Sequence, residues 1–209
     1  MLSLYHARDT RSLRCLWLLE ELGLPYRLHW VAFPPVLKQP QFLAINPAGT
    51  LPWLVDGDQA IGESVAILLH LALRHGEGRL MLPPDDPGHA ALLHWTLFGE
   101  TELASALSTM LRYNVFLPKA ERQPAVVEDY RNKALRGINQ LDAALQAGPW
   151  LCGTTFTVAD ISVGYALLLA ELFGLSAHYP PATAAYLQRL KERPALIRAR
   201  GLTPPSSEG

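Results

Sequence analysis

The N-terminal part of the chain switches between the period of a strand and the period of a helix. Leu2 and Leu4 alternate with their neighbours, as in a half-buried strand. The apolar positions that follow Thr10 lie three and four residues apart on one helical face: Cys15, Leu18, Leu19 and Leu22. Gly23 ends this run, and alternation resumes up to Trp30. Strand, helix and strand in so short a stretch predict a βαβ unit with parallel strands.

Three further signals follow one another along the chain. Leu51-Pro52 is an X-Pro bond directly before an apolar run, where a cis bond is possible and would aim the preceding backbone at a ligand. Gly57, preceded by Asp and flanked by apolar residues, indicates a β-hairpin. Glu63 and Ser64 then open an apolar run of helical length, and a helix start offers free N–H groups to an anion. A simple helix cap would explain Ser64 alone, but not the ordered set.

These elements form a first block of order β-α-β-(short α)-β-β-α, which ends near His75. Four strands with helices packed on them predict a small α/β layer. Turn-forming residues follow, and from Pro87 onward the chain reads almost wholly helical. We therefore predict an α/β domain over residues 1–76, a linker over 77–86 and an all-helical domain over 87–209.

One pair of residues in the helical part has a clear structural role. Thr157 and Asp160 have the spacing of a capping box, with Asp in place of Glu. They open an apolar helix over residues 161–173. Because such side chains satisfy the free N–H groups of a helix start, we assign both residues to stability rather than to catalysis.

The composition excludes several classes of protein. Of the 209 residues, 49% are hydrophobic, which is enough for a sizeable core. The formal net charge of −1 offers no basic excess for nucleic acid. No apolar run reaches the length of a membrane span, and the first residues lack the basic region and cleavage site of a signal peptide. With two cysteines no disulfide framework is expected, and a cytoplasmic location fits best.

The seven histidines raise the question of a metal site. His89 and His94 are five residues apart, as are His70 and His75, and this spacing does not share a helix face. No cluster of Cys or carboxylate residues accompanies the first pair in the sequence. The sequence therefore predicts no metal site.

The order X-Pro, hairpin, Glu-Ser, helix resembles the glutathione transferase family, and the stretch from Trp150 to Ile161 is similar to the C-terminal motif of that family. The resemblance covers nearly the whole chain. It implies a thioredoxin-like N-terminal domain with a four-stranded mixed sheet, followed by an all-α domain. It also implies that glutathione is a co-substrate, that no prosthetic group is needed and that the chain forms a homodimer.

The resemblance also assigns roles to the residues that would bind glutathione. A cis bond at Pro52 would present the backbone of Leu51 to the cysteinyl part of glutathione. Glu63 and Ser64 would hold the γ-glutamyl end. Lys38 falls where relatives place a residue that grips the glycyl carboxylate, and a lysine in a solvated loop is an equal alternative.

A transferase of this kind must ionise a thiol whose free pKa is about 8.5, and a hydrogen-bond donor near a helix N-terminus favours the thiolate. Many relatives read Ser-Arg-Ser-x-Arg here with the first Ser as donor, and Thr10 takes that place in this chain. Ser12 lies further into the helix, and Tyr5 occupies the position of the catalytic tyrosine in the animal Tyr-type classes. All three remain candidates, with helix capping or strand packing as the alternatives. Arg11 would add positive potential near the sulfur, or lie on a solvated helix face.

A cysteine in this loop would indicate thiol–disulfide exchange through the protein's own sulfur, and none is present. Cys15 lies on the apolar face of its helix and reads as a small core residue. Cys152, beside Trp150, is expected to be buried as well. Reductase chemistry that depends on a protein cysteine is therefore not expected.

The resemblance implies that the protein conjugates the glutathione thiolate to hydrophobic electrophiles. Candidate wall residues for the electrophile lie on the expected helix over residues 89–117, with core packing as the alternative for each of them: Trp95, Phe98, Met110 and Tyr113. A glutathione-dependent peroxidase, a disulfide reductase that uses glutathione as redox partner, and a non-catalytic glutathione-binding module are alternatives on the same fold.

Overall fold

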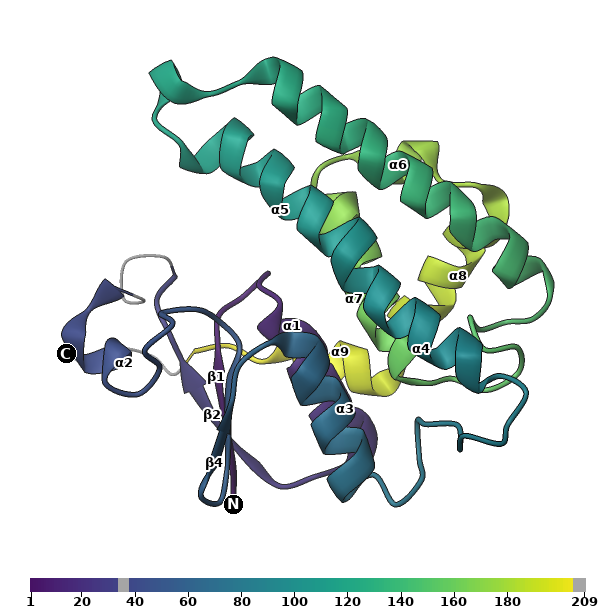
Figure 1. Ribbon diagram of the computed structural model, residues 1–209, viewed down its shortest axis with the longest axis horizontal. Coiled ribbons are helices and arrows are strands. Elements are labelled where there is room, and N and C mark those ends of the chain that lie inside the picture. The colour runs from purple at the N-terminus through teal and green to yellow at the C-terminus, as the bar shows by residue number, and fades with distance from the viewer. Residues whose placement is uncertain (34–37, 205–209) are drawn as a thin grey trace. The chain divides into compact units, whose positions relative to one another are not determined.

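The structure is a computed structural model that describes residues 1–33 and 38–204. The chain forms two compact units, one of residues 1–79 together with the segment from Glu192 onward, and one of Leu80–Lys191. Figure 1 shows that the strands belong to the first unit and that the second unit is built of helices. Within the described residues, no helix is both long enough and apolar enough to cross a membrane.

The first unit contains a four-stranded mixed sheet of strand order β2-β1-β3-β4. The strands are β1 (Leu2–His6), β2 (Tyr26–Trp30), β3 (Trp53–Asp56) and β4 (Gln59–Ile61). Strand β1 pairs with β2 in parallel and with β3 in antiparallel orientation, so Leu4 lies opposite both Leu28 and Leu54. Gly57, with a φ of 64°, turns the chain between β3 and β4. The predicted α/β class, βαβ unit and hairpin are confirmed.

Helices pack against this sheet, and α1 is covered on several sides because it is apolar on more than one flank. The helices of the first unit are α1 (Ser12–Leu22), α2 (Pro40–Leu43), α3 (Ser64–His75) and α9 (Pro194–Gly201). Every side chain from Leu13 to Leu19 is buried, and α1 contacts β1, α3 and α9. Gly23 ends α1 in the left-handed conformation.

Helix α9 comes from the far end of the chain and joins the first unit. Two arginines tie it to α1. Arg193 binds the carboxylate of Glu21 through Nε and Nη2 at 2.6 and 2.8 Å, and Arg198 Nε donates to Glu20 at 2.7 Å. The first unit is therefore built from both ends of the sequence.

The second unit is helical throughout its regular elements. These are α4 (His89–Phe98), the π-helical η2 (Gly99–Ala104), α5 (Ser105–Leu111), the π-helical η3 (Arg112–Phe116), the 3-10 helix η4 (Lys119–Glu121), α6 (Pro124–Gln146), α7 (Val158–Leu172), the 3-10 helix η5 (Leu175–His178) and α8 (Pro181–Lys191). The elements from α4 to η3 follow one another without a gap. The long helix predicted over residues 89–117 is thus a helix with two π-helical stretches.

Helix α7 forms the core of the second unit, since every residue from Val158 to Ala170 is buried. It packs against α4, η2 and α8. At Gly99 a Cβ atom would lie 2.5 Å from the Oγ of Ser162, so this approach requires glycine. The predicted capping box of Thr157 and Asp160 is present at the start of α7.

Candidate functional site

The loop before β3 contains the Leu51-Pro52 bond, and this bond is cis. Asn46 is fully buried, and its side chain stabilises the loop by hydrogen bonds to the loop backbone. Its Nδ2 donates to the carbonyl of Thr50 at 2.7 Å, and its Oδ1 accepts from the N–H of Ala48 at 3.0 Å. An asparagine side chain that bonds to its own following backbone orders a turn. Asn46 therefore fixes the backbone in front of the cis bond.

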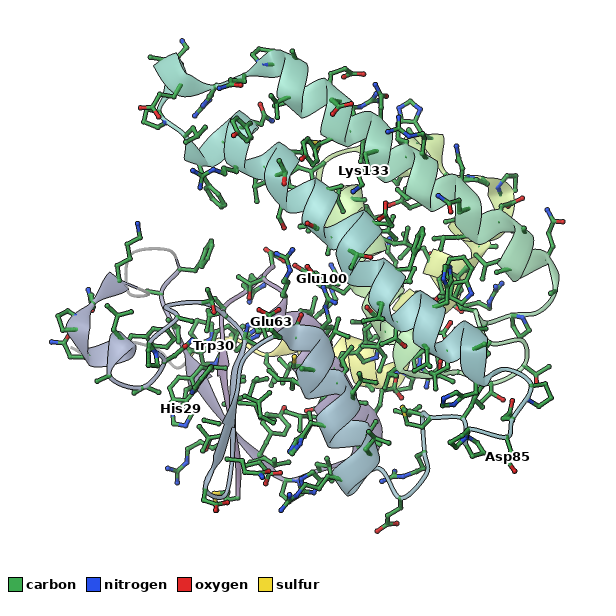
Figure 2. The ribbon with its side chains drawn as sticks, in the orientation of Figure 1. His29, Trp30, Glu63, Asp85, Glu100 and Lys133 are labelled. Carbon is green, nitrogen blue, oxygen red and sulfur yellow. The ribbon has the colours of Figure 1, made fainter. Side chains whose placement is uncertain are left out.

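The N-terminus of α3 carries Glu63 and Ser64, and Figure 2 shows Glu63 at this end of the helix. Glu63 has a φ of 56° and a ψ of 106°, a combination that non-glycine residues rarely adopt. Such a conformation costs about 1–3 kcal/mol and persists where the surrounding structure imposes it. The Glu63 side chain is exposed, whereas Ser64 is buried. The strained backbone thus holds an exposed carboxylate at a helix start.

Three side chains at the start of α1 form a hydrogen-bonded chain, the hydroxyl relay of His6, Ser12 and Thr10. Ser12 Oγ lies 2.7 Å from His6 Nδ1 and 2.6 Å from Thr10 Oγ1. Thr10 Oγ1 lies 2.8 Å from the carbonyl oxygen of Ala7. His6 and Ser12 are buried and Thr10 is half-buried, so Thr10 is the open end of the relay.

Only one arrangement of protons places a hydrogen in all three of these short contacts. The carbonyl of Ala7 accepts, so Thr10 donates to it. The hydroxyl of Ser12 then donates to Thr10 at 2.6 Å, a shorter contact than its 3.2 Å distance to the carbonyl of Ala7, and His6 donates to Ser12 from Nδ1–H. Along the relay each hydroxyl accepts from the group before it and donates to the group after it, an order that strengthens every donor in the chain. The relay therefore points its donors from His6 towards Thr10.

The electrostatics of His6 agree with a neutral ring in the relay. Burial lowers the pKa of His6 to about 4, with a contribution from the positive charge of Arg8, against the hydrogen bond with Ser12. A free histidine has a pKa of about 6.5, so His6 is neutral at pH 7 and remains so well below it.

The depressed pKa of His6 predicts a loss of stability in acid. Between the unfolded value of about 6.5 and the folded value of about 4, the unfolded state binds the proton and the folded state does not. The contribution is fully present above pH 6.5 and is lost as the pH falls towards 4. We expect it to lower the free energy of unfolding by about 2 kcal/mol between pH 7 and pH 5, measured by denaturant titration.

The variant His6→Asn isolates this contribution, because asparagine places a polar atom near Nδ1 and does not titrate. Its stability should change less between pH 7 and pH 5 than that of the parent. The matched control is His94→Asn, the same substitution at an exposed position on α4. Equal pH dependence in the parent and in His6→Asn would contradict a buried neutral His6.

The structure places Tyr5 away from the relay. Side chains alternate along a strand, so Tyr5 lies on the opposite face of β1 from His6. Its ring stacks on His29 with centroids 4.5 Å apart and meets Phe42 edge-on at 6.0 Å. Tyr5 also lines a cavity of about 430 Å³ beside β2 and α2. In the described residues, no hydrogen bond joins its phenol to Thr10 or Ser12.

Neither cysteine is a reactive group of this site. Burial raises the pKa of the Cys15 thiol to about 12, and its Sγ lies 3.6 Å from the carbonyl of Ser64. Burial also raises the pKa of Cys152, which contacts Thr157 in the second unit. Thiolates are the reactive form of cysteine, so neither side chain is prepared for nucleophilic attack at neutral pH.

The remaining candidates are spread over the two units. Arg11 is the N-cap residue of α1, and Lys38 is exposed at the edge of the described segment. In the second unit the four residues proposed for the electrophile divide into two buried ones, Phe98 and Met110, and two half-buried ones, Trp95 and Tyr113. Phe98 packs with Trp95 at a ring distance of 5.1 Å, which is a core contact of α4.

Sequence reasoning did not assign His6 or Asn46 to the site. The Asn46-Pro47 dipeptide is a turn signal that points to an ordered loop, although it does not show which groups the side chain binds. For His6 the sequence carries no such signal. Its link to Ser12 spans six residues across the junction of β1 and α1, and only the fold brings the two atoms together.

Comparison with known proteins identifies the family. The family model described as "Glutathione S-transferase, N-terminal domain" matches residues 10–74, and the corresponding C-terminal domain model matches residues 124–192. Glutathione S-transferase GstB of Escherichia coli is 33% identical over 195 residues, which cover 90% of this chain and 91% of GstB. Disulfide-bond oxidoreductase YfcG of Escherichia coli is 30% identical over 207 residues, covering 95% of this chain and 94% of YfcG.

Solved structures agree with these relatives. The glutathione transferase URE2P6 from Phanerochaete chrysosporium, in complex with oxidized glutathione, superposes with a TM-score of 0.84 at 28% identity, covering 95% of this chain and 94% of that one. A family member from Pseudomonas fluorescens with two glutathione molecules bound gives a TM-score of 0.81 at 28% identity, covering 95% and 92%. The chain belongs to the glutathione S-transferase family.

Proposed function

We propose that this protein binds glutathione on its first unit, holds the thiol as a thiolate beside Thr10, and conjugates it to hydrophobic electrophiles. The observation that carries this proposal is the hydroxyl relay at the start of α1, which offers an open, polarised hydroxyl and no protein thiol. The relatives and solved structures of the family, including those with glutathione bound, support it.

Thr10 fits the donor role better than Ser12 for a geometric reason. Ser12 is completely buried, and its hydroxyl is engaged by His6, Thr10 and the backbone of Ala7. Thr10 is half-buried, and its proton points to a carbonyl that a sulfur anion can replace as acceptor. When glutathione binds, the hydroxyl of Thr10 turns from the carbonyl of Ala7 to the sulfur. Ser12 and His6 act as positioning residues behind it.

The reaction then proceeds by nucleophilic substitution. The thiol of glutathione gives its proton to solvent, and the hydrogen bond from Thr10 with the N-terminus of α1 stabilises the sulfur anion. The thiolate forms a carbon–sulfur bond to the electrophile, and the leaving group departs with the electron pair of the bond that breaks. The protein contributes positioning and a lowered thiol pKa, and no prosthetic group takes part.

The rest of glutathione is assigned to groups of the same unit. The backbone of Leu51, turned by the cis bond to Pro52, pairs with the cysteinyl part. Glu63 binds the α-ammonium of the γ-glutamyl end, and Ser64 binds its carboxylate at the start of α3. Lys38 and Arg11 supply positive charge towards the glycyl carboxylate and the sulfur, respectively.

The Glu63 assignment predicts a loss of affinity. Glu63→Ala removes one charged hydrogen bond to the ligand's ammonium group, worth about 1.5–3 kcal/mol, so glutathione should bind roughly 10- to 100-fold more weakly. Isothermal titration calorimetry measures this change. Glu77→Ala is the matched control, since Glu77 is also an exposed glutamate with positive φ, here 52°. Unchanged affinity in Glu63→Ala would remove Glu63 from the site.

A second candidate function is disulfide exchange with glutathione as the redox partner. It is favoured by the relative named a disulfide-bond oxidoreductase, which aligns over 95% of this chain, and by the oxidized glutathione in a neighbouring structure. Two glutathione thiols would reduce a substrate disulfide and leave as oxidized glutathione. This chemistry needs no protein cysteine, in agreement with the high thiol pKa of Cys15.

One experiment separates the two functions. Glutathione is titrated into the protein, binding is followed by tryptophan fluorescence, and the thiolate absorbance of the bound ligand is recorded across pH. Turnover is then measured with an activated aryl halide and with a small disulfide. A lowered thiol pKa with conjugation of the halide supports the transferase, and turnover of the disulfide alone supports the reductase. No binding at millimolar glutathione would contradict both.

Three properties complete the proposal. The pocket for the electrophile is proposed to include Trp95, Phe98, Met110 and Tyr113. The protein is proposed to act as a homodimer in the cytoplasm. Sedimentation of the purified chain tests the dimer directly.

A further inference from the structure

A second polar cluster lies in the first unit, apart from the hydroxyl relay, and consists of Asp56, His70 and His75. Asp56 is the last residue of β3, and the two histidines lie on the second half of α3. Their three potential ligand atoms lie within 4.8 Å of one another. Two imidazole nitrogens and one carboxylate oxygen thus converge where the β3–β4 hairpin meets the end of α3.

Both histidines are directed at the same carboxylate oxygen. Asp56 Oδ2 lies 2.9 Å from His70 Nε2 and 2.7 Å from His75 Nε2. The rings of the two histidines are 6.1 Å apart, because the carboxylate reaches between them from the neighbouring strand. Burial pushes the pKa of the Asp56 carboxyl upward, but the hydrogen bonds from His75 and His70 outweigh it, and the pKa lies below its ordinary value. Asp56 is therefore an anion with two imidazoles at hydrogen-bond distance.

A shared metal ion would require these three side chains to adjust their positions. Zinc lies about 2.0–2.1 Å from histidine nitrogen and about 2.0–2.2 Å from a carboxylate oxygen. At such lengths, the carboxylate oxygen and each histidine nitrogen, 2.7 to 2.9 Å apart, would subtend an angle of roughly 80–90° at the ion. A tetrahedral ion would need donors about 3.4 Å apart. The carboxylate would then withdraw by a few tenths of an ångström from each histidine, and the two imidazole nitrogens, which lie within 4.8 Å of each other, would close to that distance.

We propose that Asp56, His70 and His75 bind a divalent transition-metal ion of the zinc type. Two nitrogen donors and one oxygen donor favour zinc, cobalt or nickel over magnesium and calcium, which take oxygen ligands. Without metal, each imidazole donates its Nε2–H to Asp56, because a carboxylate only accepts. With metal, the Nε2 lone pairs bind the ion and the ring protons reside on Nδ1.

A positive charge lies beside the cluster and opposes the binding of a cation. Arg74 Nε lies 3.5 Å from the same Oδ2 of Asp56, and its side chain is 56% exposed. Arg74 Nη1 also donates to Gln59 on β4 at 3.2 Å. The guanidinium weakens cation binding while it stays near the carboxylate, and its exposure allows it to swing into solvent. Removing this charge should therefore tighten the binding of a cation, which a purely structural hydrogen-bond cluster does not predict.

The ion would cross-link the end of β3 to the end of α3. A ligand that binds the folded state alone raises its stability by mass action, so metal binding should raise the Tm. This cross-link closes the segment of residues 56–75, which begins and ends at the cluster. This role concerns the stability of the first unit and requires no step of the proposed conjugation, so it can fail or hold independently of that function.

The test uses the untagged full chain after treatment with a chelator. Zinc is titrated by calorimetry at pH 7.5, and cobalt absorbance reports the ligand field. We expect saturable binding of one ion per chain and a Tm increase that the chelator reverses. His70→Gln and His75→Gln should each weaken binding at least about tenfold, as expected for the loss of one metal ligand. Arg74→Gln should bind zinc more tightly than the parent.

The matched control is His94→Gln, which removes an exposed histidine from the second unit and should leave zinc binding unchanged. Saturable binding that survives in both His70→Gln and His75→Gln would place the ion elsewhere and overturn the proposal. So would an absence of binding by the parent at millimolar zinc. Should the histidine variants fail to fold, the parent titration and Arg74→Gln still decide the question, because weaker binding in Arg74→Gln contradicts the site.

Discussion

Replacing Asp160 by alanine is expected to destabilise the helical unit by about 3–5 kcal/mol, because each buried hydrogen-bond donor left without an acceptor costs about 1–3 kcal/mol. Asp160 is completely buried. Its Oδ2 accepts from the N–H of Thr157 at 2.9 Å, and its Oδ1 accepts from the N–H of Leu151 at 2.9 Å and from the hydroxyl of Tyr186 at 2.8 Å. Alanine leaves all of these donors unpaired in the interior.

The measurement is the free energy of unfolding by denaturant titration. Asp160→Asn gives the intermediate case, since the amide keeps the shape but has one acceptor oxygen in place of two. Asp129→Asn is the control, because Asp129 is exposed on α6 and its replacement should change the stability by less than about 0.5 kcal/mol. A loss below about 1 kcal/mol in Asp160→Ala would mean that the network contributes little beyond a helix cap.

Thr10→Val is expected to lower kcat/KM by about 100-fold, the lower end of the range for removing one donor that stabilises developing or bound negative charge. Valine keeps the branched shape of threonine and removes only the hydroxyl. The thiol pKa of bound glutathione should rise towards its free value, and thiolate absorbance across pH measures this directly. Ser12→Ala should lower kcat/KM by less, since its hydroxyl acts through Thr10.

Two further variants make this prediction specific. Tyr5→Phe tests the rival donor, and the position of Tyr5 in the stack with His29 predicts kcat/KM close to the parent value. Thr154→Val is the matched control for the substitution itself, because Thr154 is exposed in the loop before α7. If Thr10→Val kept full activity and Tyr5→Phe lost it, the phenol would be the donor and the relay would be structural.

The parts of the fold that sequence reasoning predicted are those with local causes. The strands around Leu4 and Leu54, the hairpin at Gly57 and the capping box at Thr157 each follow from residues close together in the chain. The cis bond before Pro52 is also a property of one dipeptide and its position. Such signals act between residues that are close together in the chain, so the sequence alone reveals them.

Contacts between residues far apart in the sequence could not be predicted in this way. The spacing of His70 and His75 argued against a shared ligand, and their convergence depends on Asp56, which a different element supplies. The relay to His6 likewise depends on the angle at which α1 leaves β1. Helix α9 lies in the part of the chain that was predicted to be helical, but its partner α1 lies about as far away in the sequence as the chain allows.

The return of α9 to the first unit has a consequence for the order in which this protein folds during synthesis. The ribosome releases the N-terminal residues first, and domains generally fold as they emerge. Here Glu20 and Glu21 on α1 meet Arg198 and Arg193 only after residues 193–198 have been made. Until then one flank of α1 stays uncovered, and the second unit can fold before the first is complete.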